Sequence, residues 1–189
     1  KGHTISNISI GTESTPLESD VFGLFGATGG KISNLNLDGV TICGIAKNVS
    51  GYIIGLAGAL AGSASGPIEN CHVTNLNMTM NTPDSGMAVA YWIGGLVGAL
   101  DGSQHIEECS ASGTIKELSG KGSIGGLIGE LGKAAKITYS HADVALDVKS
   151  DYYGGANVGG LIGKGNGKND PETVISNCYA TGHVTGGAY

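Results

Sequence analysis

Three of the four cysteines recur at one point of a repeated sequence pattern. Cys71, Cys109 and Cys178 each stand fourth in a phrase that begins with isoleucine, and other copies carry Leu35 or Ser140 there. A position that accepts leucine, serine and cysteine is typical of a small buried side chain, so we expect free thiols. The alternative is a disulfide between Cys71 and Cys109, because repeats stacked about 4.8 Å apart bring two Cα atoms within bridging range.

The cysteines and histidines do not form a metal-binding pattern. No Cys-x-x-Cys pair is present, and Cys43 lies outside the repeated phrases. His72 and His141 share one repeat position, but a repeat carrying Ser110 separates them by about 10 Å, too far for one metal ion. The stretch "HIEE" at 105–108 does not complete a His-Glu-x-x-His motif. We therefore predict a surface row of imidazoles and no metal or other cofactor.

Cleavage of a polysaccharide would require paired carboxylates on one face of neighbouring repeats. Asp38 and Asp143 stand near the isoleucine phrase, but three repeats, or about 14 Å, separate them. Asp101 and Glu130 belong to neighbouring repeats, yet they stand at different distances from a repeated leucine and are out of register. We therefore predict that the chain is not an enzyme, and a carbohydrate-active β-helix enzyme is an alternative.

Aromatic residues are the candidates for contact with a ligand or partner. Tyr52 and Trp92 each stand four residues before a leucine of the repeated glycine-rich phrase, and Tyr91, Tyr152 and Tyr153 precede other copies. Exposed aromatic rows stack on sugar rings or anchor protein partners. These five residues form the predicted binding site, and the alternative is that they pack beneath loops.

The elements that must position these side chains come from an internal repeat. The phrase Gly-Leu-x-Gly, preceded by an aliphatic residue, occurs five times with leucine spacings of 32, 40, 31 and 34 residues. The aligned leucines are Leu24, Leu56, Leu96, Leu127 and Leu161. A glycine precedes each leucine and another follows two residues later, which accounts for part of the unusually high total of 35 glycines.

A second phrase follows each copy of the first. It starts with isoleucine and ends in alternating polar and apolar residues, which predicts a β-strand. The five copies begin at Ile32, Ile68, Ile106, Ile137 and Ile175. The stretch "ISNISIG" from Ile5 matches the same phrase and adds a partial copy at the start of the chain.

A unit of about 35 residues with two short strands cannot bury its apolar face alone, whereas stacked copies bury it continuously. We therefore predict an all-β fold, a parallel β-helix-like solenoid of about five and a half repeats, in a single domain over residues 1–189. A β-propeller or a β-sandwich is the alternative. The variable stretches 77–91 and 165–173 are predicted to be loops.

The glycine-rich phrase resembles the GLUG repeat of bacterial secreted and surface proteins, which include immunoglobulin A metallopeptidases and haemagglutinin-like adhesins. Three copies match well, at 94–98, 125–129 and 159–163, and the copies at 22–26 and 54–58 are degenerate. The resemblance implies an extracellular module, secreted or attached to the bacterial cell surface. It implies no catalytic residue.

Charge and hydropathy argue against a nucleic-acid partner and against insertion into a membrane. The chain carries 10 basic and 16 acidic residues without a basic cluster, so we expect no nucleic-acid partner. The apolar run at 85–100 is shorter than the roughly 20 residues that span a bilayer, so we expect no membrane insertion. No secretion signal precedes the first repeat, and we expect the domain to be a segment of a larger protein with flanking domains.

Together these observations predict a non-catalytic extracellular repeat domain. Its role would be adhesion, binding of a host glycoprotein or immunoglobulin, or spacing of other domains. The alternatives are an accessory domain of a secreted immunoglobulin A-type metallopeptidase and the carbohydrate-active enzyme named above.

Overall fold

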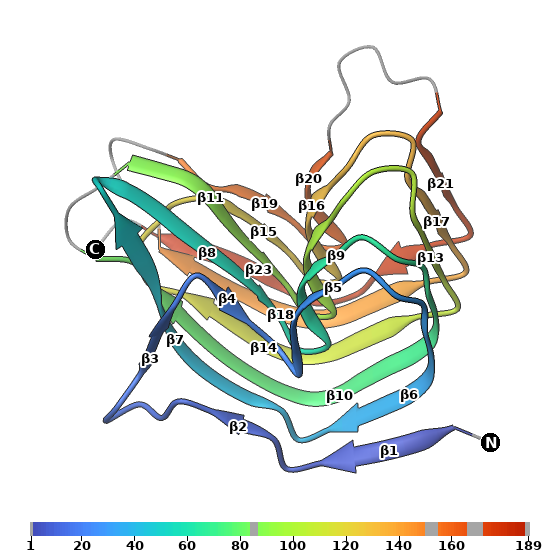
Figure 1. Ribbon diagram of the computed structural model, residues 1–189, viewed down its shortest axis with the longest axis horizontal. Coiled ribbons are helices and arrows are strands. Elements are labelled where there is room, and N and C mark those ends of the chain that lie inside the picture. The colour runs from blue at the N-terminus through green and yellow to red at the C-terminus, as the bar shows by residue number, and fades with distance from the viewer. Residues whose placement is uncertain (1, 84–86, 150–154, 166–171, 188–189) are drawn as a thin grey trace.

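The computed structural model describes residues 2–83, 87–149, 155–165 and 172–187, and in these every regular element is a β-strand (Figure 1). Each strand pairs in parallel with its counterpart in the next repeat, apart from one antiparallel hairpin between β7 and β8. The predicted parallel β-solenoid is therefore confirmed. No helix in the described part of the chain is long and apolar enough to cross a membrane.

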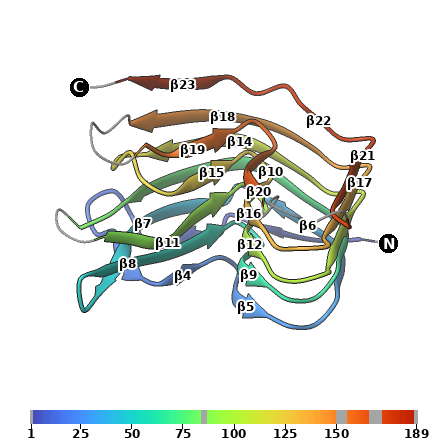
Figure 2. The ribbon, with the colours of Figure 1, turned by 90° about the horizontal axis from the view of Figure 1, so that it is seen from above.

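The strands form three parallel stacks, which Figure 1 shows end-on and Figure 2 shows from the side. The long stack contains β1 (His3–Ser6), β2 (Ser9–Ile10), β3 (Leu17–Ser19), β6 (Ile32–Asp38), β7 (Thr41–Val49), β10 (Ile68–Asn81), β13 (His105–Glu107), β14 (Ser110–Glu117), β17 (Lys136–Thr138), β18 (His141–Lys149), β21 (Val174–Ser176), β22 (Tyr179–Ala180) and β23 (Val184–Gly187). The return stack contains β4 (Val21–Phe22), β8 (Tyr52–Gly58), β11 (Met87–Gly94), β15 (Ser123–Gly125) and β19 (Asn157–Gly159). The short stack contains β5 (Phe25–Thr28), β9 (Ala61–Ala64), β12 (Val97–Leu100), β16 (Ile128–Leu131) and β20 (Ile162–Gly165).

Alternation along the long strands divides the core from the outer face. In β10 the side chains of Cys71, Val73, Leu76, Met78 and Met80 are buried, whereas the other residues between Cys71 and Met80 reach the surface. The same inward positions repeat from turn to turn, so that Met78 pairs with Ile42 on one side and Ile115 on the other. The core is thus a set of aliphatic ladders, as the near absence of phenylalanine and tryptophan requires.

The register corrects the predicted alignment of the second repeat. Leu56 does not belong to the leucine ladder, because it pairs with Val21 and Trp92 in the return stack. Ala61 pairs with Phe25 and with Val97, which places the preceding Leu60 in the ladder. The stretch "GLAGALAG" at 55–62 contains two similar phrases four residues apart. With the second phrase in the ladder, β8 continues past Leu56 and pairs with β11 as far as Gly58.

The first turn is also shifted from its predicted register. Ile5 pairs with Leu37 and Ile10 with Ile42, so "ISNISIG" matches the end of the isoleucine phrase and not its beginning. A strand pattern of period two is satisfied by more than one register. The observed register packs Ile8 and Ile10 against the core.

The prediction of a loop at 77–91 is wrong for most of that stretch. Residues 77–81 extend β10, and residues 87–91 belong to β11. Met78 and Met80 alternate with polar residues, and both side chains are buried in the core. The free energy gained by their burial favours a strand here, although the residues between them are typical of loops. Much of the other predicted loop, 165–173, lies outside the described residues.

Three columns of glycine allow the return stack and the short stack to meet in a narrow vertex. A Cβ atom on Gly94 would lie 2.0 Å from the carbonyl oxygen of Val97, and one on Gly98 would lie 2.9 Å from that of Trp92. A Cβ on Gly95 would lie 2.8 Å from the Cβ of Ala111 on the long stack. The repeated phrase therefore marks the place where three backbones approach too closely for side chains.

Replacement of a vertex glycine is expected to destabilise the solenoid strongly. Gly94→Ala forces a methyl group against backbone atoms that cannot rotate away, and we expect a loss of about 3 kcal/mol in the free energy of unfolding. Gly30→Ala is the matched control, because nothing lies within 4 Å of its added Cβ, and its effect should stay within about 0.5 kcal/mol. Chemical denaturation of both variants measures the difference. Equal stabilities would contradict the close-approach explanation.

Candidate functional site

Outward-facing side chains of the long stack form polar ladders that run from turn to turn. One ladder contains His72, Ser110, His141 and Tyr179 in sequence, as the register shows. His72 Nδ1 lies 2.9 Å from Ser110 Oγ, and the ring of His141 stacks on that of Tyr179 with centroids 4.7 Å apart. The prediction that His72 and His141 share a position two turns apart is confirmed. Partial burial, followed by the nearby His141, lowers the pKa of His72.

The acids expected to be far apart are held separately by their own neighbours. Asp38 accepts hydrogen bonds from Thr74 Oγ1 at 2.8 Å and Asn75 Nδ2 at 2.7 Å, and these bonds lower its pKa. Asp143 accepts a bond of 2.9 Å from Thr181 Oγ1 at the far end of the stack. Neither carboxylate faces the other, so they do not form the pair that glycoside hydrolysis uses.

The second candidate acid pair is out of register, as predicted. Leu100 pairs with Leu131, which leaves Asp101 two positions beyond the level of Glu130. Glu130 is almost fully buried and contacts Lys164 Nζ at 3.4 Å, whereas the exposed Asp101 accepts a 3.3 Å bond from Ser63. The two carboxylates therefore belong to separate contacts.

The three described members of the predicted aromatic site, Tyr52, Tyr91 and Trp92, do not form a row in the structure. Tyr52 is 52% exposed and pairs with Met87 beside the β7–β8 hairpin, whereas Trp92 is half-buried and pairs with Leu56 and Ser123. The placement of Tyr52 and Trp92 at one level is wrong, because it depended on Leu56 as the repeat leucine. Tyr91, which is 1% exposed, packs in the core. Tyr152 and Tyr153 lie outside the described residues.

Other aromatic residues occupy the outer face, and sequence reasoning missed them. Tyr139 is 59% exposed and Tyr179 is 55% exposed, in the last two turns of the long stack. They stand third and fifth in copies of the isoleucine phrase, on either side of the fourth, inward position. The alternation of that phrase was the available signal, since it assigns Tyr179 and its stacked partner His141 to the outer face.

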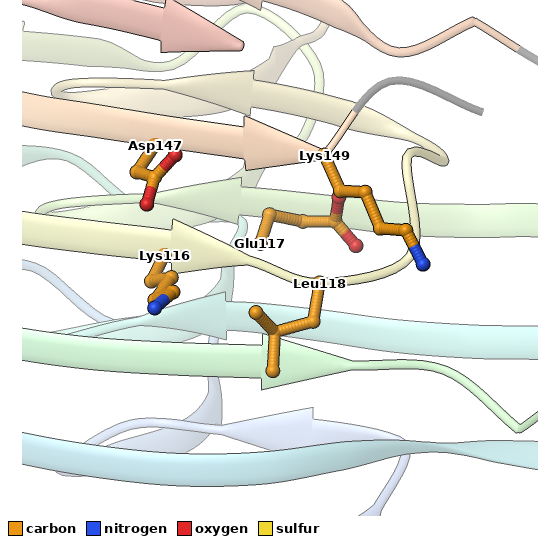
Figure 3. Close-up of a pocket in the computed structure, with 5 residues that line it drawn as sticks. All are labelled: Lys116, Glu117, Leu118, Asp147 and Lys149. Carbon is orange, nitrogen blue, oxygen red and sulfur yellow. The ribbon is translucent and has the colours of Figure 1, made fainter. Parts of the chain in front are cut away.

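Two shallow recesses flank the ladders of the outer face. We call the first the glutamate recess; Glu69 in it contacts Lys31 Nζ at 2.5 Å and His105 Nε2 at 2.9 Å, and both contacts lower the pKa of its carboxyl. It is lined by Ser33, Asn34, Glu69, Asn70, Glu107 and Glu108. We call the second the lysine groove (Figure 3); it is lined by Lys116, Glu117, Leu118, Asp147 and Lys149.

Glu117 is the one acid of the lysine groove that occupies an inward position. Its register partners are Met80 and Val148, and its side chain is 1% exposed. The carboxylate accepts bonds from the backbone N–H and hydroxyl of Ser119 and, at 2.7 Å, from the N–H of Gly120. Burial nevertheless raises the pKa of Glu117, because desolvation of the charge outweighs these bonds.

Tyr91 lies close enough to Glu117 for their charges to interact. Burial, and then the Glu117 carboxylate, raise the pKa of Tyr91 well above its ordinary value. Its hydroxyl has no partner with hydrogen-bond geometry among the described residues. Tyr91 thus fills the core beneath the groove and presents no ring to a ligand.

At the repeated cysteine position, the fourth of the isoleucine phrase, a cysteine or serine side chain hydrogen-bonds to the backbone of its own turn, and we call this position the seat. Cys71 Sγ, Cys109 Sγ and Ser140 Oγ each donate to the carbonyl oxygen two residues earlier, at 3.3, 3.1 and 2.8 Å. The residue before the seat has positive φ in every turn, and these residues are Asn34, Asn70, Glu108, Tyr139 and Asn177. Serine and cysteine exchange here because both close the same left-handed bend.

The prediction of free thiols is confirmed, since all four cysteines are unbridged. Cys43, Cys71 and Cys109 are buried and Cys178 is half-buried. Burial raises the pKa of the Cys43 thiol. Within the described residues, no group of three or more His, Cys, Asp or Glu side chains is placed to hold a metal ion.

Stacked parallel turns, glycine columns at the vertex and polar ladders outside define the class of this protein as a repeat-built β-solenoid. The particular repeat is the GLUG motif, whose family model matches residues 90–116 and 154–185 and thereby confirms the resemblance. Residues of the chain are also 33% identical, over 147 positions and 72% of its length, to Halomucin of Haloquadratum walsbyi. The chain spans 2% of the length of that relative. No solved structure matches the chain.

The hydrogen bond at the seat predicts that serine in place of Cys71 is more stable than alanine. Cys71→Ser keeps a donor for the Glu69 carbonyl, as Ser140 does in its own turn, so its stability should lie within about 0.5 kcal/mol of the parent. Cys71→Ala removes that donor and should cost about 1 kcal/mol more. Denaturant titration under reducing conditions gives both values. If alanine were better tolerated than serine, the position would select apolar volume and not a hydrogen bond.

The raised pKa of Glu117 predicts a pH dependence with a defined sign. Its carboxyl binds a proton more tightly in the folded than in the unfolded chain, so its stabilising contribution is complete below the ordinary pKa of 4.5 and declines as the pH rises through the folded value. Glu117→Gln should flatten this decline in the free energy of unfolding. Glu108→Gln, at an exposed residue, is the control and should leave the decline unchanged. A parent-like slope in Glu117→Gln would contradict the assignment.

Proposed function

We propose that this chain is a non-catalytic GLUG module of a surface or extracellular protein, and that it binds glycoprotein partners through the outer face of the long stack. The exposed pair Tyr139, in the bend before β18, and Tyr179, in β22, carries the proposal, because aromatic rings on a rigid scaffold contribute contact area at little entropic cost. Tyr179 is further held by its stack on His141. Hydroxyl and carboxylate groups beside the rings, such as Thr181 and Asp143, supply the hydrogen bonds that sugars require.

The placement outside the cell is supported by the GLUG motif and by the similarity to Halomucin. The non-catalytic role is supported by the separation of Asp38 from Asp143 and of Asp101 from Glu130. Incubation with polysaccharides should release no reducing ends. Release that is lost in Glu130→Gln would favour the carbohydrate-active enzyme instead.

Removal of the two exposed rings tests the binding proposal. The double variant Tyr139→Ala and Tyr179→Ala should weaken binding to immobilised mucin glycoproteins by about tenfold or more, because exposed aromatic anchors carry much of such contacts. Tyr52→Ala, which removes an equally exposed ring beside the distant hairpin, is the matched control and should bind like the parent. Surface plasmon resonance at fixed salt gives all three affinities.

Two outcomes would overturn the proposed binding face. Parent protein that fails to bind any glycoprotein would favour a spacer role, in which the solenoid only separates flanking domains. Binding to purified immunoglobulin A that survives loss of both tyrosines would favour immunoglobulin recognition elsewhere, as in an accessory domain of a metallopeptidase.

A further inference from the structure

We propose that Cys71 and Cys109 form a redox-active dithiol, which a small disulfide such as oxidised glutathione converts into a bridge between the second and third turns. The two residues stand directly opposite each other in the long stack, since His72 pairs with Ser110 and Glu69 with Glu107 on either side of them. In-register parallel strands place such Cα atoms about 4.8 Å apart, within the range that a disulfide spans.

The contacts of the Cys109 sulfur reach across to the turn that carries Cys71. Cys109 Sγ points back toward the turn of Cys71 and accepts a bond of 3.4 Å from its backbone N–H. The same sulfur lies 3.6 Å from the carbonyl oxygen of Ile68, also in that turn. The proximity of the two thiols lowers the pKa of Cys71 to about 7, while it raises the pKa of Cys109. Cys71 is thus the more acidic thiol of the pair, and it becomes the nucleophile when it loses its proton.

No other pair of cysteines in the described residues has this relation. Cys43 pairs with Thr79 in its neighbouring turn, and Ser140 lies between Cys109 and Cys178 in the ladder. The chain therefore has a single position where two thiols meet in adjacent turns. Its bridge would close a loop between residues 38 positions apart.

The chemistry is two thiol–disulfide exchanges. The Cys71 thiolate attacks one sulfur of oxidised glutathione, forms a mixed disulfide and releases one glutathione thiolate. Cys109 then gives its proton to solvent and attacks the Cys71 sulfur, which expels the second glutathione. Two cysteine thiols and one glutathione disulfide become one protein disulfide and two glutathione thiols. Because both thiols are buried, the exchange takes place when the turns open or before they close.

Refolding in glutathione buffers tests the proposal. The full chain is unfolded, refolded in mixtures of reduced and oxidised glutathione, and mapped by mass spectrometry without reduction. We expect one cross-link, Cys71 to Cys109, and a higher denaturation midpoint for the oxidised than for the reduced protein, because the bridge restricts the unfolded chain. Cys43→Ser should leave the cross-link unchanged, whereas Cys109→Ser should abolish it and the gain in midpoint.

The serine variant keeps the hydrogen bonds of the seat, as Ser140 shows, so loss of the cross-link in Cys109→Ser cannot be attributed to misfolding. Two results would overturn the proposal. One is a folded protein whose Cys71 and Cys109 stay reduced in fully oxidised glutathione. The other is a cross-link that involves Cys43 or Cys178 as often as the proposed pair.

Discussion

The close approach of three backbones at the glycine vertex is the constraint on which this solenoid depends. Each turn folds back on itself where the return stack meets the short stack, and the fold brings Gly98 against the backbone of Trp92 in the same turn. The same vertex presses Gly95 onto Ala111 of the long stack, and the next turn repeats this contact between Gly126 and Ala142. A Cβ atom on Gly95, Gly98 or Gly126 would force the sheets apart, which would open the core on both sides of the vertex.

The outer face of the long stack follows from this geometry. A turn held closed at its centre keeps the long strands in register, so their inward residues form the core and their outward residues form ladders. Tyr179 on His141 and His72 beside Ser110 are products of that register. The same register stacks Cys71 on Cys109 inside the core. The seat, where a hydrogen bond stabilises the turn, therefore also carries the proposed dithiol.

Sequence reasoning succeeded where a physical pattern recurs several times. Five copies of the glycine-rich phrase predicted the stacked fold, and the exchange of cysteine with serine and leucine predicted free buried thiols. It failed where one repeat offered two solutions: residues 55–62 contain two overlapping phrases, and the wrong choice of Leu56 placed Tyr52 level with Trp92. Tyr91 was assigned to the binding site because it precedes a copy of the glycine-rich phrase, although it fills the core beneath Glu117.

The sequence by itself determined the repeat, the all-β character and the identity of the ladder that carries the cysteines, because periodic burial leaves a periodic pattern of residues. Only the tertiary structure decided which residues face each other across turns. Register in parallel strands depends on the sum of core contacts over the whole turn, and a shift of one residue reverses every side chain. For that reason the exposed pair of Tyr139 and Tyr179, the burial of Tyr91 and the contact between Cys71 and Cys109 emerge from the stacked turns and not from any one of them.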